Sequence, residues 1–361
     1  MTYEKHVYII AEAGVNHNGS VEIAKQLIDV AVDAGVDAIK FQTFKTDNII
    51  SAGVPKAEYQ VRTTGSFESQ YEMLKKLELG EEAFQVLKEY CDSRKIQFLS
   101  TPFDLESLDL LVKKFDLPII KIPSGEITNA PLLLLAAGTN KPIIVSTGMC
   151  NLGEIEEALG ILAYGYLDSN SRPSLESFKA AYNSKEGQKT LVKKVTLLHC
   201  TTEYPAPFED VNLRAINTLN SAFGLPVGLS DHTPGIAVSI AAVAFGASVI
   251  EKHFTLDKNL TGPDHKASLN PDELKTLVKS IREVELAMGE RMKIPAPSEF
   301  KNKTIARKSL VAALDIKKGD LFTELNLTTK RPGTGVSPLY YWEWLGKTAG
   351  KDYKKDEMIG L

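Results

Sequence analysis

The chain has 361 residues, of which 43% are apolar and 24% are charged, and these fractions are typical of a globular protein with a large core. Its formal net charge of −4 provides no basic surface for nucleic acid or an anionic membrane, so an anionic ligand must be held by a few placed cations. Three scattered cysteines exclude a disulfide framework, no apolar run reaches the ~20 residues of a membrane span, and the amino terminus lacks a signal-peptide pattern. We therefore expect a cytoplasmic protein.

Short runs rich in isoleucine and valine recur along the chain, with amphipathic segments between them. We predict eight strands, which begin at Val7, Asp37, Gln97, Pro118, Pro142, Val195, Pro226 and Ser248. We predict helices over residues 21–34, 105–115, 152–163 and 271–288, where apolar residues are three or four positions apart. Near-continuous apolar strands joined by helical crossovers predict an α/β fold, a (β/α)8 TIM barrel. The alternative, a doubly wound open sheet, lacks support because no GxGxxG follows the first strand.

Three connections carry information about organisation. Residues 43–66 follow the second predicted strand, on the side of the barrel where chemistry occurs, and we expect them to act as a lid. Residues 165–194 lie between a helix and the next strand, which places them on the opposite face, without a catalytic role. Residues 289–304 contain two prolines and no clear period, so we predict a linker between a barrel of residues 1–288 and a small domain of residues 305–361.

Polar side chains stand at the end of every predicted strand. They are Glu12, Lys40, Gln42, Thr101, Lys121, Ser124, Glu126, Ser146, His199, Tyr204, Ser230, His232 and His253. A single serine or threonine at such a place is more often a helix cap than a ligand contact. Because the carboxyl ends of barrel strands share one rim, the joint pattern predicts an active site there.

Two histidines end neighbouring strands. His232 ends the seventh strand and His253 the eighth, so their imidazoles can meet at one divalent ion, with Asp231 and Glu12 nearby. The alternative for each is a hydrogen-bonded core histidine. Two nitrogen ligands leave positions open for water or substrate, which favours a catalytic manganese, magnesium or zinc ion over a closed structural zinc.

Lys40 and Lys121 each follow an apolar run and must lie inside the barrel or at its lip. A buried unpaired ammonium group is costly, so each lysine needs a carboxylate partner or an anionic ligand. Glu12 and Glu126 are candidate partners. With the surrounding hydroxyl groups, the two lysines also form a plausible cradle for a phosphate or carboxylate group.

Several longer motifs resemble, in order and spacing, those of the bacterial sialic acid synthase family. They are "AEAGVNHNGS", "IKFQTFK", "STPFD", "KIPSGEITN", "IVSTGM", "LLHCTTEYPAPFEDVNL", "GLSDHT", "EKHFTLDK" and "GPDHKAS". Residues 305–333 resemble the family's C-terminal SAF domain, a β-clip fold similar to type III antifreeze protein. The resemblance extends over nearly the whole chain except residues 165–194. It implies condensation of phosphoenolpyruvate with an N-acylated mannosamine.

The resemblance also implies a role for individual residues. His232 and His253 match metal ligands, usually for Mn²⁺, with Mg²⁺ possible. The positions that match phosphoenolpyruvate contacts are Lys40, Thr101, Lys121, Ser124, Ser146 and Ser230, with Glu126 close by; Thr202 replaces an asparagine of some members. The positions that match sugar contacts are Glu12, which is our candidate for proton transfer, Gln42, Tyr204 and Asp264. Arg331 matches an arginine that reaches the partner's site in a domain-swapped homodimer.

Two other functions remain alternatives. One is a Schiff-base sialate aldolase, in which Lys121 or Lys40 forms the covalent adduct and no metal is needed. The other is a non-catalytic sugar-binding protein that retains the barrel. Within the synthase reading the sugar stays open between N-acetylmannosamine, which gives N-acetylneuraminate, and a 2,4-diacetamido-trideoxy mannose, which gives legionaminate.

Overall fold

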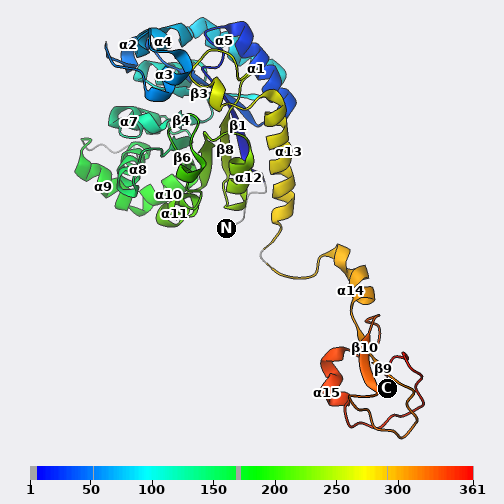
Figure 1. Cartoon of the computed structure of the whole chain (residues 1–361). Coiled ribbons are helices and arrows are strands. Elements are labelled where there is room, and N and C mark those ends of the chain that lie inside the picture. Colours follow the sequence, from blue (N-terminus) through cyan, green and yellow to red (C-terminus); the bar gives the residue numbers. More distant parts are fainter. Residues whose placement is uncertain (1–5, 52, 168–171, 291, 361) are drawn as a thin grey trace. The chain divides into compact units, whose positions relative to one another are not determined.

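The computed structural model describes residues 6–51, 53–167, 172–290 and 292–360. After Gly289 the chain divides into two compact units. The first contains a sheet of eight parallel strands, and the second contains a sheet of two antiparallel strands (Figure 1).

The strands of the first unit form a ring. They are β1 (Tyr8–Gly14), β2 (Ala38–Thr43), β3 (Gln97–Pro102), β4 (Ile120–Ile122), β5 (Ile143–Ser146), β6 (Val195–Cys200), β7 (Val227–Asp231) and β8 (Val249–His253). They pair in the order β3-β2-β1-β8-β7-β6-β5-β4, and the two strands at the ends of this order, β3 and β4, also lie side by side. The ring is therefore nearly closed, and the predicted TIM barrel with its eight strands is confirmed.

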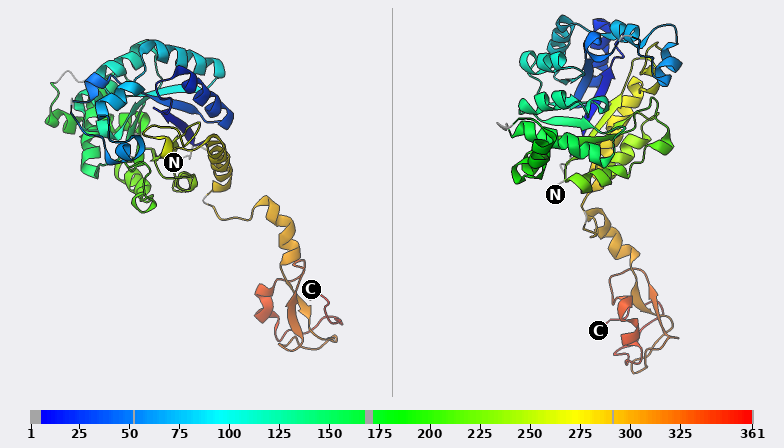
Figure 2. Two further views of the ribbon diagram at one scale, coloured as in Figure 1. Left: turned by 45° about the horizontal axis from the view of Figure 1, so that its top comes forward. Right: turned by 90° about the vertical axis from the view of Figure 1, so that its left-hand side faces the viewer.

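Helices surround this ring in the views of Figures 1 and 2. The α-helices of the first unit are α1 (Val21–Ala34), α2 (Thr46–Ile49), α3 (Glu58–Thr64), α4 (Gln70–Leu77), α5 (Glu81–Arg94), α6 (Leu105–Asp109), α7 (Ala130–Gly138), α8 (Leu152–Tyr166), α9 (Leu175–Asn183), α10 (Lys185–Lys194), α11 (Ala215–Phe223), α12 (Ala237–Ala244) and α13 (Pro271–Met288). The predicted helix over 105–115 has two parts, the α-helix α6 and a π-helical segment, η1 (Leu110–Lys114), that follows it directly. Among the described residues, no helix is both long and apolar enough to cross a bilayer.

Helices α1 and α13 begin and end at the predicted residues because their capping signals are local. The Ser20 side chain accepts a hydrogen bond from the backbone N–H of Ile23, and Gly35 ends α1 in the left-handed conformation. Asn270 and Glu273 form a capping box at the start of α13, with Pro271 in its first turn. Such signals are complete within a few residues and need no tertiary context.

The interior of the barrel is built in two layers. The lower layer is apolar and includes Ile10, Ala38, Leu99, Ile144, Leu198 and Val249. Side chains two positions further along each strand point to the same face. These positions hold Glu12, Lys40, Thr101, Ser146, Cys200 and Glu251, and all of them line a cavity at the carboxyl ends of the strands. The apolar layer therefore closes the bottom of the barrel beneath a polar layer.

Gly228 is the β7 member of the lower layer, and a larger side chain has no room there. A Cβ atom at this position would contact the Val249 carbonyl oxygen and lie 2.7 Å from Leu198 Cδ2. We expect Gly228→Ala to lower the free energy of unfolding by about 1–3 kcal/mol through overpacking, measured by urea denaturation. Gly138→Ala is the matched control, since a Cβ at Gly138 meets no atom within 4 Å. Equal stabilities of the two variants would contradict tight packing in the apolar lower layer of the barrel.

The segment expected to act as a lid contains helices. Residues 43–66 include α2 and α3, and together with α4 these helices lie at the end of the barrel away from α10 and α11 in Figure 1. Residues 46–77, with residue 52 outside the described ranges, are called the mouth segment below.

Most of residues 165–194 form helices α9 and α10, which pack on α8. Residues 168–171 lie outside the described ranges. Helix α10 leads into the amino end of β6, the end away from the cavity, and none of the insert's described residues lines that cavity.

The second unit is small and has its own core. Strands β9 (Ser309–Ala312) and β10 (Leu327–Lys330) are antiparallel. Its buried apolar side chains are Leu310, Ala312, Ile316, Phe322, Leu327, Ala349, Tyr353 and Ile359. Helix α14 (Phe300–Ala306) occupies the end of the predicted linker and buries none of its residues, which explains why the sequence there has no hydrophobic period. A four-residue helix, α15 (Tyr341–Trp344), follows β10.

Candidate active site

A cavity of about 600 Å³ opens at the carboxyl ends of the barrel strands. Its walls include the predicted strand-end residues other than His199, together with Thr202 and Asp264: Glu12, Lys40, Gln42, Thr101, Lys121, Ser124, Glu126, Ser146, Thr202, Tyr204, Ser230, His232, His253 and Asp264. His199 does not line this cavity, because its ring is bonded to the Val211 carbonyl oxygen, and Arg331 is an exposed residue of the second unit. The cavity has the volume usual for small-molecule sites.

Four buried charges form the floor of this cavity. Lys40 Nζ lies 2.6 Å from Glu12 Oε2, and Lys121 Nζ lies 2.9 Å from Glu251 Oε1. Glu251 also lies 3.6 Å from Lys40, so its carboxylate bridges the two lysines. Burial alone raises the pKa of Glu251, but Lys121 and Lys40 together hold it well below its usual range. Burial raises the pKa of Glu12 against the opposing effect of Lys40.

Glu251 is the main functional residue that the sequence prediction missed, and its presence corrects the expected pairing of the lysines. Glu126 was a candidate partner of a buried lysine, but its carboxylate accepts a hydrogen bond from Asn129 Nδ2 at 2.6 Å instead. Lys121 pairs with Glu251. The signal was present, because Val249, Glu251 and His253 alternate along β8 and must share the inner face.

The two strand-end histidines lie side by side above the charged floor. Their ring centroids are 5.6 Å apart. His232 Nδ1 donates a hydrogen bond to the Thr201 carbonyl oxygen at 2.6 Å, so the lone pair is on Nε2, which lies 3.3 Å from Ser230 Oγ. His253 Nδ1 is buried without a hydrogen-bond partner and lies 3.8 Å from Asp264 Oδ2. Burial lowers the pKa of His232 to about 4 and holds that of His253 well below its usual value, so both rings are neutral.

These residues fit a divalent metal ion with open coordination positions. A neutral imidazole whose other nitrogen donates to a carbonyl group is the usual metal ligand. The ring centroids are 5.6 Å apart, close enough that one nitrogen of each imidazole could bind the same ion. Among the described residues no group of three or more His, Cys, Asp or Glu side chains could hold an ion. Remaining ligands would have to come from substrate or water.

A fully buried ion pair supports the histidines from behind. Lys252 Nζ lies 3.0 Å from Asp231 Oδ2 and joins β8 to the end of β7. The other Asp231 oxygen accepts hydrogen bonds from the backbone N–H and the hydroxyl group of Thr233. Because Asp231 directly precedes His232 and Lys252 directly precedes His253, this pair fixes the spacing of the two imidazoles. Lys252 belongs to the structural support and does not line the cavity.

Hydroxyl groups and one glycine surround the lysines. Thr101 Oγ1 accepts a hydrogen bond from Lys40 Nζ at 2.9 Å. The hydroxyl groups of Ser146 and Thr202 are buried and have no hydrogen-bond partner among the described residues, which leaves them available to a ligand. Gly148 donates its N–H to Ser124 Oγ at 3.0 Å, and a Cβ there would contact Thr202 Oγ1. The close approach of this backbone requires glycine.

Carboxyl, amide and aromatic groups also line the cavity. Gln42 Nε2 donates to Glu12 Oε1 at 3.4 Å. The Tyr204 ring packs on His232, with centroids 4.1 Å apart, and on Tyr59 of the mouth segment, with centroids 5.1 Å apart. Burial raises the pKa of Asp264 to about 7. These groups suit the hydroxyl and amide groups of a sugar.

The other histidines have structural partners. His199 Nε2 donates to the Val211 carbonyl oxygen, and His265 is hydrogen-bonded to Thr255 and Asn18. His17 Nδ1 accepts a hydrogen bond from the Gly19 N–H, and His6 is paired with Asp37 on the surface. The structure therefore separates His232 and His253 from the remaining imidazoles.

Comparison with known proteins agrees with this geometry. Residues 27–293 match the NeuB family and residues 307–360 match the SAF domain. The chain is 56% identical to the N,N'-diacetyllegionaminic acid synthase of Campylobacter jejuni, over 98% of this chain and 99% of that protein. It is 46% identical to the synthase of the same name from Legionella pneumophila, over 92% of this chain and 87% of that protein.

A solved structure shows the same fold. The N-acetylneuraminic acid synthetase of Leptospira borgpetersenii, in complex with citrate, matches with a TM-score of 0.65 and 35% identity, over 82% of this chain and 90% of that chain. The resemblance to sialic acid synthases in the sequence motifs is thereby confirmed. The chain belongs to the NeuB family, and its C-terminal unit is a SAF domain.

Proposed function

We propose that this protein is a nonulosonic acid synthase that condenses phosphoenolpyruvate with 2,4-diacetamido-2,4,6-trideoxymannose and water, giving N,N'-diacetyllegionaminate and phosphate. The observation that carries the proposal is the cavity at the strand ends, which two buried lysines and two neutral histidines line together. The choice of sugar follows the two relatives that are synthases of diacetyllegionaminic acid.

Phosphoenolpyruvate is assigned to the floor of the cavity. Lys40 and Lys121 would bind its phosphate and carboxylate groups, and Thr101, Ser124, Ser146, Thr202 and Ser230 would supply hydroxyl groups. In the structure both lysines are already neutralised by Glu12 and Glu251. Binding a multiply charged anion therefore requires further positive charge.

A divalent cation held by His232 and His253 would supply part of that charge. The charged side chains that line the cavity are two lysines and four carboxyl groups, those of Glu12, Glu126, Glu251 and Asp264. Even with Asp264 protonated, the described lining carries no net positive charge. We assign Mn²⁺, with Mg²⁺ as the second choice. When bound, the ion would polarise the aldehyde oxygen of the open-chain sugar.

The protein's own groups would then direct the chemistry. A carbon–carbon bond forms between C3 of phosphoenolpyruvate and C1 of the sugar, water adds to C2 of phosphoenolpyruvate, and the C2–O bond to phosphate breaks. Glu12 lies beside Lys40 and Gln42, where it could take the proton of that water or hold the sugar. Gln42, Tyr204 and Asp264 would orient the sugar hydroxyl and N-acyl groups.

Two further parts of the proposal concern assembly and compartment. We propose a homodimer in which the partner subunit's Arg331 contacts the sugar, since an arginine offers several donors and adds positive charge to a cavity whose lysines are paired with carboxylates. The three cysteines are free thiols, and Cys91 and Cys200 are buried, as expected for a reducing compartment such as the cytoplasm.

The test is phosphate release from phosphoenolpyruvate in the presence of each sugar. We expect manganese-dependent release with the diacetamido sugar, and at least tenfold lower kcat/KM with N-acetylmannosamine. Removal of the metal by a chelator should abolish the reaction, and adding Mn²⁺ back should restore it.

The same assay separates the alternatives. Burial lowers the pKa of Lys121, a feature shared with Schiff-base aldolases. Trapping of a pyruvate adduct by borohydride, with activity that survives chelation, would favour that function. Absence of phosphate release with every N-acylated sugar would favour a non-catalytic protein.

A further inference from the structure

The mouth segment forms a wall of the cavity with a composition unlike that of the floor. It contributes five apolar side chains, two side chains with hydroxyl groups and two amide side chains, which are Ile49, Ile50, Val54, Met73 and Leu74, then Ser51 and Tyr59, then Gln60 and Gln70. We propose that Gln60 and Gln70 recognise the second N-acyl group of the sugar and so select a diacetamido sugar over one with a hydroxyl group at that carbon. This inference rests on the proposed synthase function.

The place of this wall follows from the chemistry on the floor. The sugar's reacting aldehyde must lie near His232, His253 and the bound phosphoenolpyruvate. The rest of the open chain then extends toward the walls that those groups leave free. The mouth segment is such a wall, and it carries no charged side chain into the cavity.

An acetamido group matches this wall in each of its parts. Its methyl group can be buried against the apolar side chains, and removing that apolar area from water favours binding. Its N–H and carbonyl groups need one acceptor and one donor, which a primary amide provides. A bare hydroxyl group would leave the apolar surface facing water and one amide without a partner.

The two glutamine side chains are hydrogen-bonded to each other, and the rest of their donors and acceptors can bind a ligand. Gln60 Oε1 accepts hydrogen bonds from the Ala57 N–H at 3.0 Å and from Gln70 Nε2 at 3.2 Å. Gln60 Nε2 makes a long contact of 3.4 Å with the Tyr59 hydroxyl group. Among the described residues, no group donates a hydrogen bond to the side-chain oxygen of Gln70, Oε1. Gln70 thus presents an acceptor, and its second N–H, to the cavity.

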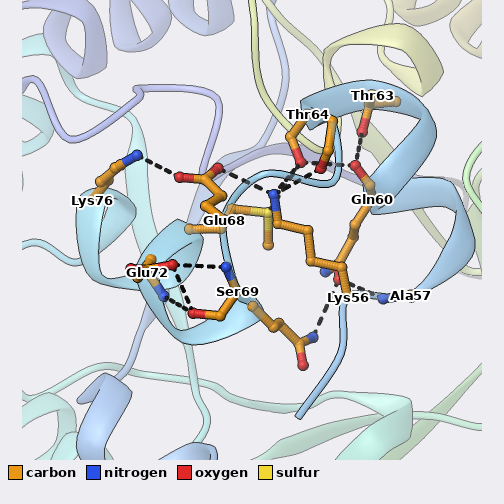
Figure 3. Close-up of polar contacts among 12 residues, drawn as sticks. Lys56, Ala57, Gln60, Thr63, Thr64, Glu68, Ser69, Glu72 and Lys76 are labelled. Carbon is orange, nitrogen blue, oxygen red and sulfur yellow. Dashed lines mark hydrogen bonds and ion pairs between the residues drawn. The ribbon is translucent and has the colours of Figure 1, made fainter. Parts of the chain in front are cut away.

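The mouth segment is held together by its own polar network, so that these amides are positioned before the sugar arrives (Figure 3). Lys56 Nζ, buried by its surroundings, bonds Thr64 Oγ1 at 2.8 Å and Glu68 Oε1 at 3.1 Å. Glu68 also pairs with Lys76 of α4. The Thr64 hydroxyl group donates to the Gln60 carbonyl oxygen at 2.8 Å. This network links α3, which carries Gln60, to α4, which begins at Gln70.

The test is the Gln70→Met variant, which keeps the volume of the side chain and removes its polar atoms. Gln70 is suited to the test because it is half-buried, whereas Gln60 also satisfies the backbone of Ala57. We expect the ratio of kcat/KM for the diacetamido sugar over N-acetylmannosamine to fall about tenfold, through a higher KM for the diacetamido sugar. The KM for phosphoenolpyruvate should not change. Gln85→Met, at a glutamine that bonds Glu89 on the surface of α5, is the control.

Calorimetric titration of each sugar into the protein with phosphoenolpyruvate withheld gives a second readout that does not need turnover. The inference would be overturned if Gln70→Met lowered the affinity and kcat/KM equally for both sugars, lowered them for neither sugar, or raised the KM for phosphoenolpyruvate. Failure of the wild-type protein to release phosphate with either sugar would instead overturn the proposed function. The two failures are therefore distinguishable.

Discussion

Lys121→Met is expected to abolish phosphate release from phosphoenolpyruvate and to lower the free energy of unfolding by about 3–5 kcal/mol. Lys121 is the main partner of Glu251, at 2.9 and 3.0 Å from its two oxygens, and both side chains are buried. Removing the ammonium group leaves the carboxylate with Lys40 at 3.6 Å, a lysine already paired with Glu12. An incompletely compensated charge would remain inside the barrel. Urea denaturation and a phosphate assay measure the two effects.

A double variant separates the loss of stability from the loss of function. Lys121→Met with Glu251→Gln removes both charges at nearly constant volume, so the Lys40–Glu12 pair stays intact and most of the stability should return. Turnover should not return, because the cation that would bind phosphoenolpyruvate is still missing. If the double variant recovered both stability and activity, Lys121 would be a purely structural residue. If Lys121→Met alone stayed fully active, the assignment of phosphoenolpyruvate to the floor would be wrong.

The barrel could be predicted because its determinants repeat along the chain. Each strand is a short apolar run, and most strands deliver a polar side chain two positions after an apolar interior residue, as Ile10 and Glu12 or Ala38 and Lys40 do. Strand β6 differs, because it delivers Cys200 to the cavity and not the predicted His199. Helices α1 and α13 each begin after a capping residue, Ser20 and Asn270, whose side chain accepts a hydrogen bond from the backbone of the first turn. These signals lie within a few neighbouring residues, so they can be recognised without knowledge of the tertiary fold.

The pairing of side chains from different strands could not be predicted, because it depends on which of them meet across the barrel. Lys121 and Glu251 are 130 positions apart, and Glu126 looked like the nearer partner on the sequence alone. Counting alternate residues back from His253 would have placed Glu251 on the inner face, but not opposite Lys121. The helices of the mouth segment were likewise missed, because α2, α3 and α4 have only 4, 7 and 8 residues. Gln60 of α3 and Gln70 of α4 line a cavity that forms between distant strands.

The structural support of the two histidines explains why the metal assignment can be tested cleanly. His253 Nδ1 has no protein hydrogen-bond partner, so shortening this residue to alanine leaves no protein donor or acceptor unsatisfied at that nitrogen. His232 bonds the Thr201 carbonyl oxygen, which loses its partner if the ring is removed. A comparison of variants at the two positions therefore distinguishes loss of the metal from loss of a structural hydrogen bond.

We expect His232→Ala and His253→Ala each to weaken Mn²⁺ binding by about 100-fold or more and to lower kcat together with it. Mn²⁺ at 100 times its dissociation constant should stabilise the wild-type protein by about 2.7 kcal/mol, and the same concentration should barely stabilise either variant. Calorimetric titration and thermal unfolding with and without Mn²⁺ measure this without any substrate. His6→Ala, which removes an exposed imidazole bonded to Asp37, should behave like the wild type. Wild-type metal binding in both site variants would mean that the two imidazoles, although 5.6 Å apart, do not hold the ion.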